Sequence, residues 1–262
     1  MRVPDEIKSV AVRSAKKAGK VLMRMSKENF VYRVKNKYDI LSEADLESEK
    51  IIINEIKKAF PDHDILSEEA GKTTEGSDFL WVIDPLDGTI NYSKKIKECC
   101  ISIAVAHENE IVLGLIYQPF SKKMYMAEKG VGAFVNGKKL RVSAEKKIIN
   151  MILATETTSN IEKRKLNYEI LSKVCHEVRS IRVSGSGASD FARIACGKID
   201  IFFQTNIHYW DYAAGALLIE EAGGQVTDFE GEKITESSKN IVASNGTAHE
   251  KIISMLNIYS TN

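Results

Sequence analysis

The sequence has no excess of charge of either sign and no long apolar run. Its 262 residues include 37 Lys and Arg against 36 Asp and Glu, a formal net charge of +1. This balance argues against recruiting nucleic acid or a membrane surface through bulk electrostatics. No run reaches the roughly 18 apolar residues of a membrane-spanning helix, and the first residues lack the apolar core of a signal peptide. We therefore expect a cytoplasmic enzyme or binding protein without nucleic-acid or membrane partners.

Cysteine and proline are also scarce, with four of each. Because Cys99, Cys100, Cys175 and Cys196 form no CxxC pair, we expect reduced thiols in the core. Hydrophobic residues make up 44% of the chain, which is enough apolar surface to exclude a largely disordered protein. The length suits one large α/β domain or two modest ones.

Hydrophobic periodicity predicts two helices and then most of the strands in the first half of the chain. The polar, basic stretch 33–45 between the two helices is interpreted as a loop, apart from a helix start at Ser42. The predicted elements are helices over about 7–25 and 42–60, strands in 63–71 and 79–83, a linker over 72–78, a hairpin over 98–118 turning at Glu108-Asn109, and short strands over 123–143 with an Asn136-Gly137 turn.

The second half alternates strands and helices, which is typical of a layered α/β unit. The basic stretch 144–150 separates the halves, so we expect a metal-binding α+β half, 1–145, and a substrate-side α/β half, 146–262, in one compact catalytic unit. The predicted strands lie in 149–155, 177–184, 198–205, 225–229 and 240–245, and the predicted helices cover 161–176, 187–197, 211–224 and about 247–258.

The segment "WVIDPLDGTINY", 81–92, ends an apolar strand with two carboxylates. Pro85 favours a rigid turn that aims Asp84 and Asp87 at one point. Two such carboxylates repel unless a proton or cation lies between them, and Mg²⁺ is the natural occupant. The amides of Gly88 and Thr89 then offer an anion site beside the metal, as phosphate-ester chemistry requires. An exposed turn with aspartates as turn formers is the alternative.

Three further acidic positions lie where predicted elements start or end. Asp45 stands at a helix start, Glu68 and Glu69 follow an apolar strand, and Asp211 precedes a long apolar helix. Asp45 and Asp211 could be N-caps or first-turn acids, and the glutamates could form a solvated edge. These acids are far apart in sequence, so only the fold can bring them together.

Four motifs in order, "DILSEAD" (39–45), "ILSEEAG" (65–71), "WVIDPLDGTINY" (81–92) and "WDYAAGALLIEEAGG" (210–224), resemble the inositol monophosphatase family. This family is a branch of the Mg²⁺-dependent, lithium-sensitive phosphatases, and the likeness covers nearly the whole chain. The resemblance implies an α/β (α+β) fold, a five-layer α/β/α/β/α sandwich. It also implies a homodimer and inhibition by lithium.

The resemblance assigns roles position by position. It implies that two or three Mg²⁺ ions, for which Mn²⁺ could substitute, are held by Glu68, Asp84, the Leu86 carbonyl, Asp87 and Asp211. Asp45 and Thr89 would orient and deprotonate the attacking water, with Glu68 contributing to the catalytic site. The implied phosphate and substrate contacts are Asp87, Gly88, Thr89, Gly185, Ser186, Gly187, Gln204 and Asp211.

The implied activity is a Mg²⁺-dependent phosphomonoesterase that hydrolyses small sugar or polyol phosphates with metal-activated water. Inositol 1-phosphate and fructose 1,6-bisphosphate are the first candidates. Gln204 stands where inositol-selective relatives carry an acidic residue, which weakens the preference for inositol. The alternatives are a phosphatase of the nucleotide 3′-phosphoadenosine 5′-phosphate and a catalytically idle binding or scaffold protein.

Some conspicuous residues are not assigned to the site. The five histidines show no metal spacing, so we expect them in packing or at the surface, with His208 nearest to the site. The basic cluster "EKRK", 162–165, is interpreted as a solvated helix face. Trp81 and Trp210 precede acidic motifs and are expected to pack beneath the metal site. Asp190 and Asp200 are interpreted as capping or surface acids.

Overall fold

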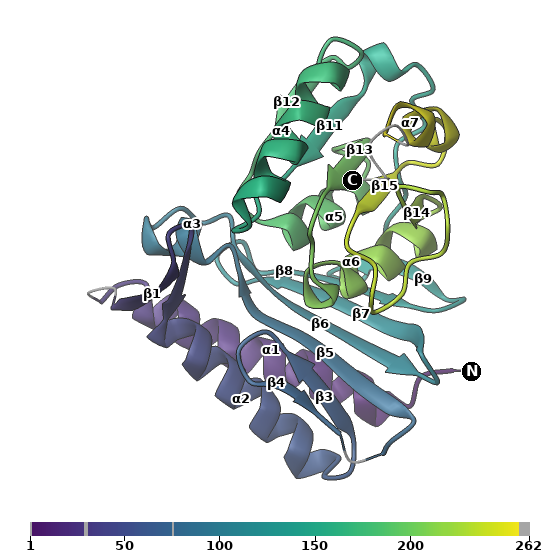
Figure 1. Ribbon diagram of the computed structural model, residues 1–262. Helices are drawn as coiled ribbons and strands as arrows, with labels where there is room; N and C mark the ends of the chain where they lie inside the picture. Colours follow the sequence, from purple (N-terminus) through teal and green to yellow (C-terminus); the bar gives the residue numbers. More distant parts are fainter. Residues whose placement is uncertain (1, 29–30, 75, 257–262) are drawn as a thin grey trace.

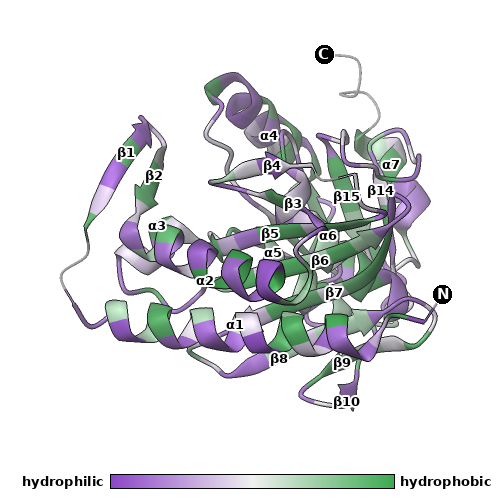
Figure 2. Ribbon diagram, turned by 90° about the horizontal axis from the view of Figure 1, so that it is seen from below, coloured by the Kyte–Doolittle hydropathy of each residue, from purple (hydrophilic) through white to green (hydrophobic). Residues whose placement is uncertain are grey.

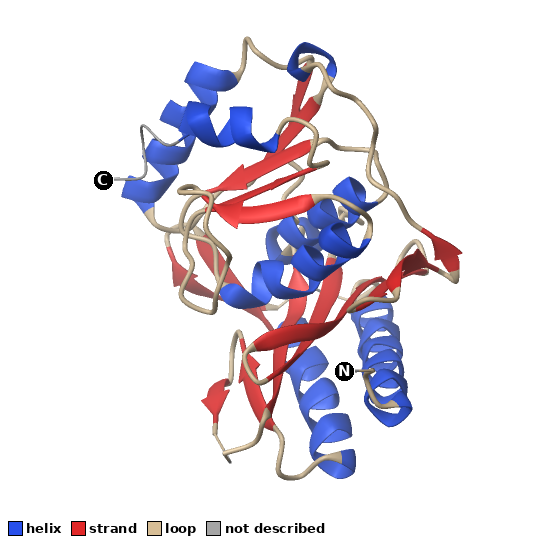
Figure 3. Cartoon of the chain, turned by 90° about the vertical axis from the view of Figure 1, so that its right-hand side faces the viewer, coloured by secondary structure: helices blue, strands red, loops and turns tan. Residues whose placement is uncertain are grey.

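Helical layers and two β-sheets alternate through the molecule (Figures 1 and 3). The computed structural model describes residues 2–28, 31–74 and 76–256. Helices α1 and α2 cover the outer face of the first sheet, α5 and α6 lie between the sheets, and α4 and α7 cover the outer face of the second sheet. The predicted five-layer α/β/α/β/α sandwich is therefore confirmed. The helices are α1 (Asp5–Met25), α2 (Glu43–Ala59), α3 (Thr89–Ser93), α4 (Ile161–Val174), α5 (Gly187–Ala195), α6 (Tyr209–Glu221), α7 (His249–Leu256) and the 3₁₀ helix η1 (Ile148–Asn150).

The first sheet has eight strands in the order β10-β9-β8-β7-β6-β5-β3-β4. Neighbours pair antiparallel except β3 with β5, which run parallel. The predicted turns at Glu108-Asn109 and Asn136-Gly137 are confirmed, since all four residues have positive φ. The strands are β3 (Asp64–Ser67), β4 (Gly71–Thr73), β5 (Phe79–Asp87), β6 (Cys100–His107), β7 (Glu110–Gln118), β8 (Lys123–Glu128), β9 (Gly132–Val135) and β10 (Lys138–Lys139).

The second sheet has five strands in the order β12-β11-β13-β15-β14. Strand β11 runs parallel to both neighbours, whereas β15 is antiparallel to β13 and β14. The carboxyl ends of β11 and β13 therefore lie at the same edge, where loops can carry functional residues. The strands are β11 (Ile152–Thr155), β12 (Ser180–Arg182), β13 (Ile201–Gln204), β14 (Gln225–Asp228) and β15 (Ile241–Ser244).

The outer helices α1 and α2 show the apolar stripe that their periodicity predicts. In α1 the buried residues include Ile7, Val10, Ala11 and Leu22, at helical spacing, and the hydropathy colouring shows hydrophobic and hydrophilic residues alternating along the helix (Figure 2). Such a stripe stabilises the helix through packing on the sheet rather than through intrinsic propensity.

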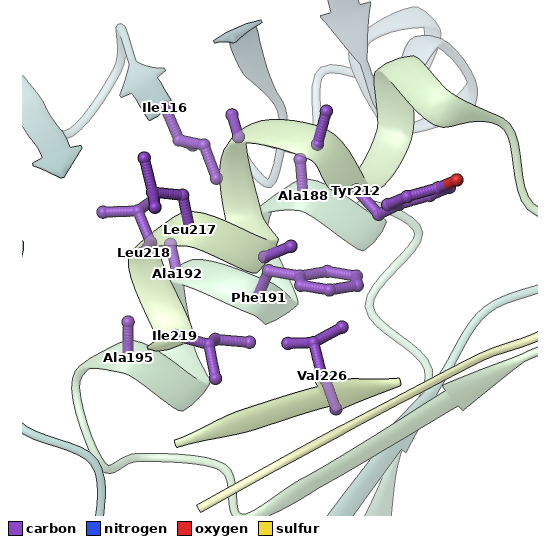
Figure 4. Close-up of a cluster of buried hydrophobic side chains, with 14 of the residues drawn as sticks. Ile116, Ala188, Phe191, Ala192, Ala195, Tyr212, Leu217, Leu218, Ile219 and Val226 are labelled. Carbon is purple, nitrogen blue, oxygen red and sulfur yellow. The ribbon is translucent and has the colours of Figure 1, made fainter. Parts of the chain in front are cut away.

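The middle helices α5 and α6 are covered on both sides and pack at backbone distance. A Cβ added at Gly215 of α6 would lie 2.4 Å from the Cβ of Phe191 in α5 (Figure 4). Toward the first sheet, a Cβ added at Gly114 of β7 would lie 2.5 Å from the carbonyl oxygen of Ala214. Glycine at these points lets α6 approach its neighbours closely, which fixes the position of its N-terminus.

Several expectations were wrong. The stretch read as a loop forms a two-stranded hairpin, β1 (Tyr32–Asn36) and β2 (Asp39–Ser42), which the sequence hides because β1 is exposed along its whole length and shows no alternation. Part of the predicted linker 72–78 belongs to β4, and the short α3 was not predicted. Cys175 is exposed rather than in the core, although the four thiols are free. The end of the last predicted helix, 257–258, lies outside the described residues.

The part of the chain that the structure describes contains no candidate for a membrane-spanning helix. None of its helices has the length and apolar character needed to cross a bilayer.

His249 of α7 gives the fold a pH-dependent stability. Its ring is 1% exposed and lies 2.8 Å from Ser244 Oγ and 2.9 Å from Thr227 Oγ1. Burial lowers the pKa of His249 to about 4. In the unfolded chain the pKa is about 6.5, so between these values only the unfolded state binds the proton and stability falls as the pH falls.

We expect the free energy of unfolding to drop by about 2 kcal/mol more between pH 7 and pH 5 in the wild type than in His249→Gln. Urea unfolding at the two pH values measures this difference. His176→Gln is the matched control, because the His176 side chain is 70% exposed. Equal pH dependence in the wild type and His249→Gln would contradict the assignment.

Candidate active site

A cavity of about 530 Å³ opens between the first sheet, the β1–β2 hairpin and the carboxyl edge of the second sheet. Most of the predicted site residues line it, although they come from distant parts of the sequence. Asp45 and Ser186 lie directly behind the wall and are hydrogen-bonded to Thr89 and Asp87 of the lining. The predicted residues in the wall are Glu68, Asp84, Leu86, Asp87, Gly88, Thr89, Gly185, Gly187, Gln204 and Asp211.

The turn that ends β5 is rigid, as Pro85 predicts. The pairing of β5 with β6 is irregular between Asp84 and Asp87, which turns the two side chains away from the regular pleat. Ser48 Oγ of α2 donates to the Pro85 carbonyl at 2.7 Å, and the Leu86 amide donates to Asp84 Oδ1 at 2.9 Å. Asp84 is only 2% exposed, and these hydrogen bonds hold the turn that carries it.

Gly88 and Thr89 begin α3 in the backbone conformation that an anion site needs. Gly88 has a φ of 92°, and an added Cβ would lie 2.9 Å from the Glu98 carbonyl oxygen and 3.1 Å from that of Gly185. Only glycine fits this left-handed, crowded position. The Thr89 hydroxyl lies 2.9 Å from Asp45 Oδ1 and 3.1 Å from the Leu86 carbonyl oxygen, so its one proton has two acceptors to choose between.

Asp45 is both a helix cap partner and the carboxylate behind Thr89. The Ser42 amide donates to Asp45 Oδ2 at 2.9 Å and the Asp45 amide donates to Ser42 Oγ at 3.3 Å, which together form the capping box of α2, and the Ser42 hydroxyl also donates to Oδ2. Burial raises the pKa of Asp45 to about 6, against the opposing hydrogen bonds from Ser42 and Thr89. The capping reading and the catalytic reading of Asp45 are therefore compatible, because its two oxygens face different partners.

Glu68 reaches the cavity from the turn after β3, which a second glutamate holds. Glu49 Oε1 of α2 accepts from the amides of Glu69 and Ala70, at 3.1 and 3.0 Å, and from the Ser67 hydroxyl. Burial raises the pKa of Glu68 to about 8, while Lys35, whose Nζ lies 3.2 Å from Glu68 Oε1, lowers it. Sequence reasoning missed Glu49, because nothing in the helical pattern marks a glutamate that holds a turn about twenty residues away.

Asp87 and Asp211 are held by the starts of α5 and α6. Asp87 Oδ2 accepts from the Ala188 amide at 3.0 Å and from the Ser186 hydroxyl. Asp211 Oδ2 accepts from the amide of His208 at 2.9 Å. Ser186, predicted as a substrate contact, thus faces Asp87 in this structure and is 1% exposed.

The turn at Ser184-Gly185 is clamped from two sides. Glu156 Oε1, at the end of β11, accepts from the amides of Ser184 and Gly185 at 2.7 and 2.8 Å. Asn91 Nδ2 of α3 donates to the carbonyls of Glu98 and Ser184, both at 2.8 Å. Sequence reasoning missed Glu156 and Asn91, which join the two halves of the wall.

The electrostatics of the cavity favour a bound cation. Burial, then repulsion from Glu68, Asp87 and Asp211, raises the pKa of Asp84 well above its usual value. Among residues 2–28, 31–74 and 76–256, no three His, Cys, Asp or Glu side chains lie close enough together in their present orientations to hold a metal ion. The donor chemistry nonetheless fits a hard divalent cation, since it is all oxygen and negatively charged, provided that the side chains turn toward one another and Lys35 withdraws.

Four further expectations concern residues near the cavity. Arg164 of the "EKRK" cluster lines the cavity, so the solvated-face interpretation was wrong for this residue. Asp190 is fully buried and paired with Arg193, not a surface acid. His208 lines the cavity and stacks on Trp210, whereas Trp81 is buried in the α1–α2 core and donates to His63 Nδ1 at 3.0 Å.

Comparison with known proteins supports the same chemistry. The model of the inositol monophosphatase family matches residues 3–261. An inositol monophosphatase 2 of Solanum lycopersicum is 34% identical, covering 97% of this chain and 98% of that protein. A fructose-1,6-bisphosphatase/inositol-1-monophosphatase of Thermotoga maritima is 36% identical, covering 84% and 83%.

The likeness extends to solved structures. The extragenic suppressor protein suhB of Bartonella henselae superposes with a TM-score of 0.92 at 37% identity, covering 98% of this chain and all of that one. Family match, sequence relatives and fold agree over nearly the whole length. The chain belongs to the inositol monophosphatase family and is a metal-dependent phosphatase, a phosphoric monoester hydrolase.

Proposed function

We propose that the protein is a Mg²⁺-dependent phosphomonoesterase acting on small sugar or polyol phosphates, with inositol 1-phosphate and fructose 1,6-bisphosphate as first substrates. The observation that carries the proposal is the meeting of Glu68, Asp84, Asp87 and Asp211 in one cavity beside the Gly88 turn. Carboxylates gathered next to the backbone amides of a helix start suit a cation on one side and a phosphate on the other.

Glu68, Asp84, Asp87, Asp211 and the Leu86 carbonyl would hold two or three Mg²⁺ ions, or Mn²⁺ in their place. Bound there, the ions would neutralise the phosphoryl oxygens and lower the pKa of the attacking water. The amides of Gly88 and Thr89 would hold the phosphate. Gly185, Ser186, Gly187 and Gln204 would contact or shape the remainder of the substrate.

Thr89 and Asp45 would move the proton of the attacking water. Thr89 Oγ1 accepts a proton from the water while its own proton passes to Asp45 Oδ1, which lies 2.9 Å away. A carboxylate with a pKa of about 6 accepts such a proton near neutral pH and returns it to the leaving oxygen afterwards. Glu68 would support the same step by holding the metal ion that activates the water.

Phosphate release from a substrate panel tests the proposal. We expect turnover of inositol 1-phosphate, fructose 1,6-bisphosphate or both with Mg²⁺, inhibition by lithium, and weaker turnover of 3′-phosphoadenosine 5′-phosphate. Faster release from the nucleotide would make that activity the function instead. No release from any ester with Mg²⁺ or Mn²⁺ would favour an idle binding protein, and sedimentation of the same sample tests the expected homodimer.

A further inference from the structure

Arg164 places a guanidinium in the wall of the cavity that the metal-site acids also line. It lies one turn into α4, and its Nε donates to the Thr158 carbonyl at 2.7 Å. The guanidinium carbon is 4.3 Å from the centre of the Tyr38 ring, which belongs to the turn of the β1–β2 hairpin. In Figure 1 this end of α4 and the hairpin lie on the same side of the molecule, near α3.

Arg164 differs in its pairing from the other cation of the cavity. The charged side chains in the wall are mostly acidic, with Lys35 and Arg164 as the basic ones among the described residues. Lys35 is paired with Glu68 and Glu69. No carboxylate of the described residues forms an ion pair with Arg164, so its charge is held in a cavity wall without a protein counter-charge.

The contacts of Arg164 orient its guanidinium group but do not neutralise its positive charge. Thr158, which accepts from Nε, is itself fixed because Asn206 Nδ2 donates to its hydroxyl at 3.0 Å. The Tyr38 ring supports the flat face of the guanidinium. Both restraints leave the terminal Nη atoms, the donors that bind phosphate or carboxylate in pairs, without a hydrogen-bond partner among the described residues.

We propose that Arg164 forms a second anion subsite, which binds the phosphate that is not hydrolysed when the substrate is a small bisphosphate. The inference rests on the proposed function and narrows its substrate class. A cavity of about 530 Å³ is within the usual size of sites for ligands larger than a monophosphate, so both ends of a bisphosphate can be held. An inositol monophosphate has no second anion to offer and gains nothing from Arg164.

Steady-state kinetics of Arg164→Gln test the subsite. We expect kcat/KM for fructose 1,6-bisphosphate to fall about 10- to 100-fold, as for loss of a charge-assisted hydrogen-bonded pair, and kcat/KM for inositol 1-phosphate to change less than about twofold. Arg164→Lys keeps the charge without the paired Nη donors and is expected to lie between. If 3′-phosphoadenosine 5′-phosphate is the better bisphosphate, its kcat/KM should fall in the same way.

Lys165→Gln is the matched control. It removes the same charge from the next position of α4, but Lys165 is exposed and its Nζ lies 3.1 Å from Glu162 Oε1, so we expect both substrates to be unaffected. Equal losses on the monophosphate and the bisphosphate in Arg164→Gln would reveal a packing role only. No loss on the bisphosphate would likewise overturn the subsite.

A binding measurement separates this inference from the proposed function. Phosphorus NMR titration of fructose 6-phosphate into metal-free protein should show binding to the wild type and to Lys165→Gln, weakened about tenfold in Arg164→Gln. If the wild type hydrolyses no ester but this pattern holds, the phosphatase proposal fails and the anion subsite stands. If the wild type hydrolyses esters but Arg164→Gln binds fructose 6-phosphate as the wild type does, the subsite fails alone.

Discussion

Replacing Asp84 by Asn is expected to reduce kcat for phosphate release by at least about 1,000-fold while leaving the fold intact. The amide keeps the size of the side chain and an oxygen that can accept from the Leu86 amide, 2.9 Å from Oδ1 in the wild type. It removes a negative charge that is buried among Glu68, Asp87 and Asp211. Loss of this charge weakens the binding of a cation. The metal-free protein is not destabilised, because it no longer buries a carboxylate that its neighbours repel.

The thermal midpoint provides the second half of this prediction. Metal-free Asp84→Asn should unfold at the same temperature as the metal-free wild type or slightly above it, and should lose most of the stabilisation that Mg²⁺ gives the wild type. Phosphate release and thermal unfolding with and without Mg²⁺ measure both effects. Retention of more than about a tenth of wild-type kcat would reject the metal assignment.

Asp200 provides a control with the opposite outcome. It is a comparably buried acid, but its oxygens accept from the Ile152 amide at 2.8 Å and from the Ser143 hydroxyl, away from the cavity. Asparagine has one oxygen for these two donors, so in Asp200→Asn either the Ile152 amide or the Ser143 hydroxyl loses its acceptor, and we expect a lower thermal midpoint with kcat within about threefold of the wild type. The contrast separates a carboxylate that serves chemistry from one that serves the fold.

The site could be predicted from sequence wherever chemistry and local backbone geometry coincide in one short segment. The Asp84–Thr89 segment fixes its own turn through Pro85 and Gly88, and Ser42 with Asp45 forms a capping box within one turn of helix. Such features need no tertiary information. The family resemblance then supplied the partners that lie far away in sequence.

What the sequence did not show is carried by single side chains whose meaning depends on tertiary contacts. Arg164 lies in a basic cluster that looks like any solvated helix face, and only the approach of Tyr38 and the Thr158 carbonyl reveals its direction. Glu49 and Glu156 are ordinary glutamates in a periodic pattern until the turns that they hold are seen. The β1–β2 hairpin escaped for a related reason, since a strand exposed on both faces has no hydrophobic alternation.

Gly114→Ala is expected to lower stability by about 3 kcal/mol, although the change adds one methyl group to a strand. The added Cβ would lie 2.5 Å from the carbonyl oxygen of Ala214 and 3.1 Å from its carbonyl carbon, so the whole of α6 must move away from β7. A helix backbone cannot rotate aside as a side chain can. For a chain of this size the loss corresponds to a thermal midpoint lower by about 6–12 °C.

The same shift should reach the active site, because α6 begins at Tyr209 and carries Asp211 in its first turn. We therefore expect Gly114→Ala to lower kcat as well, by about tenfold, even at a temperature where the variant is fully folded. Gly187→Ala is the stability control: its φ is not positive and its nearest neighbour to an added Cβ, Gln204 Oε1, is 3.8 Å away, so its midpoint should stay near that of the wild type. If Gly114→Ala kept both its thermal midpoint and its kcat, the prediction would be wrong. The backbone contact between β7 and α6 could then relax at little cost, unlike close-packed backbone, and α6 would not be the rigid element that holds Asp211 at the cavity.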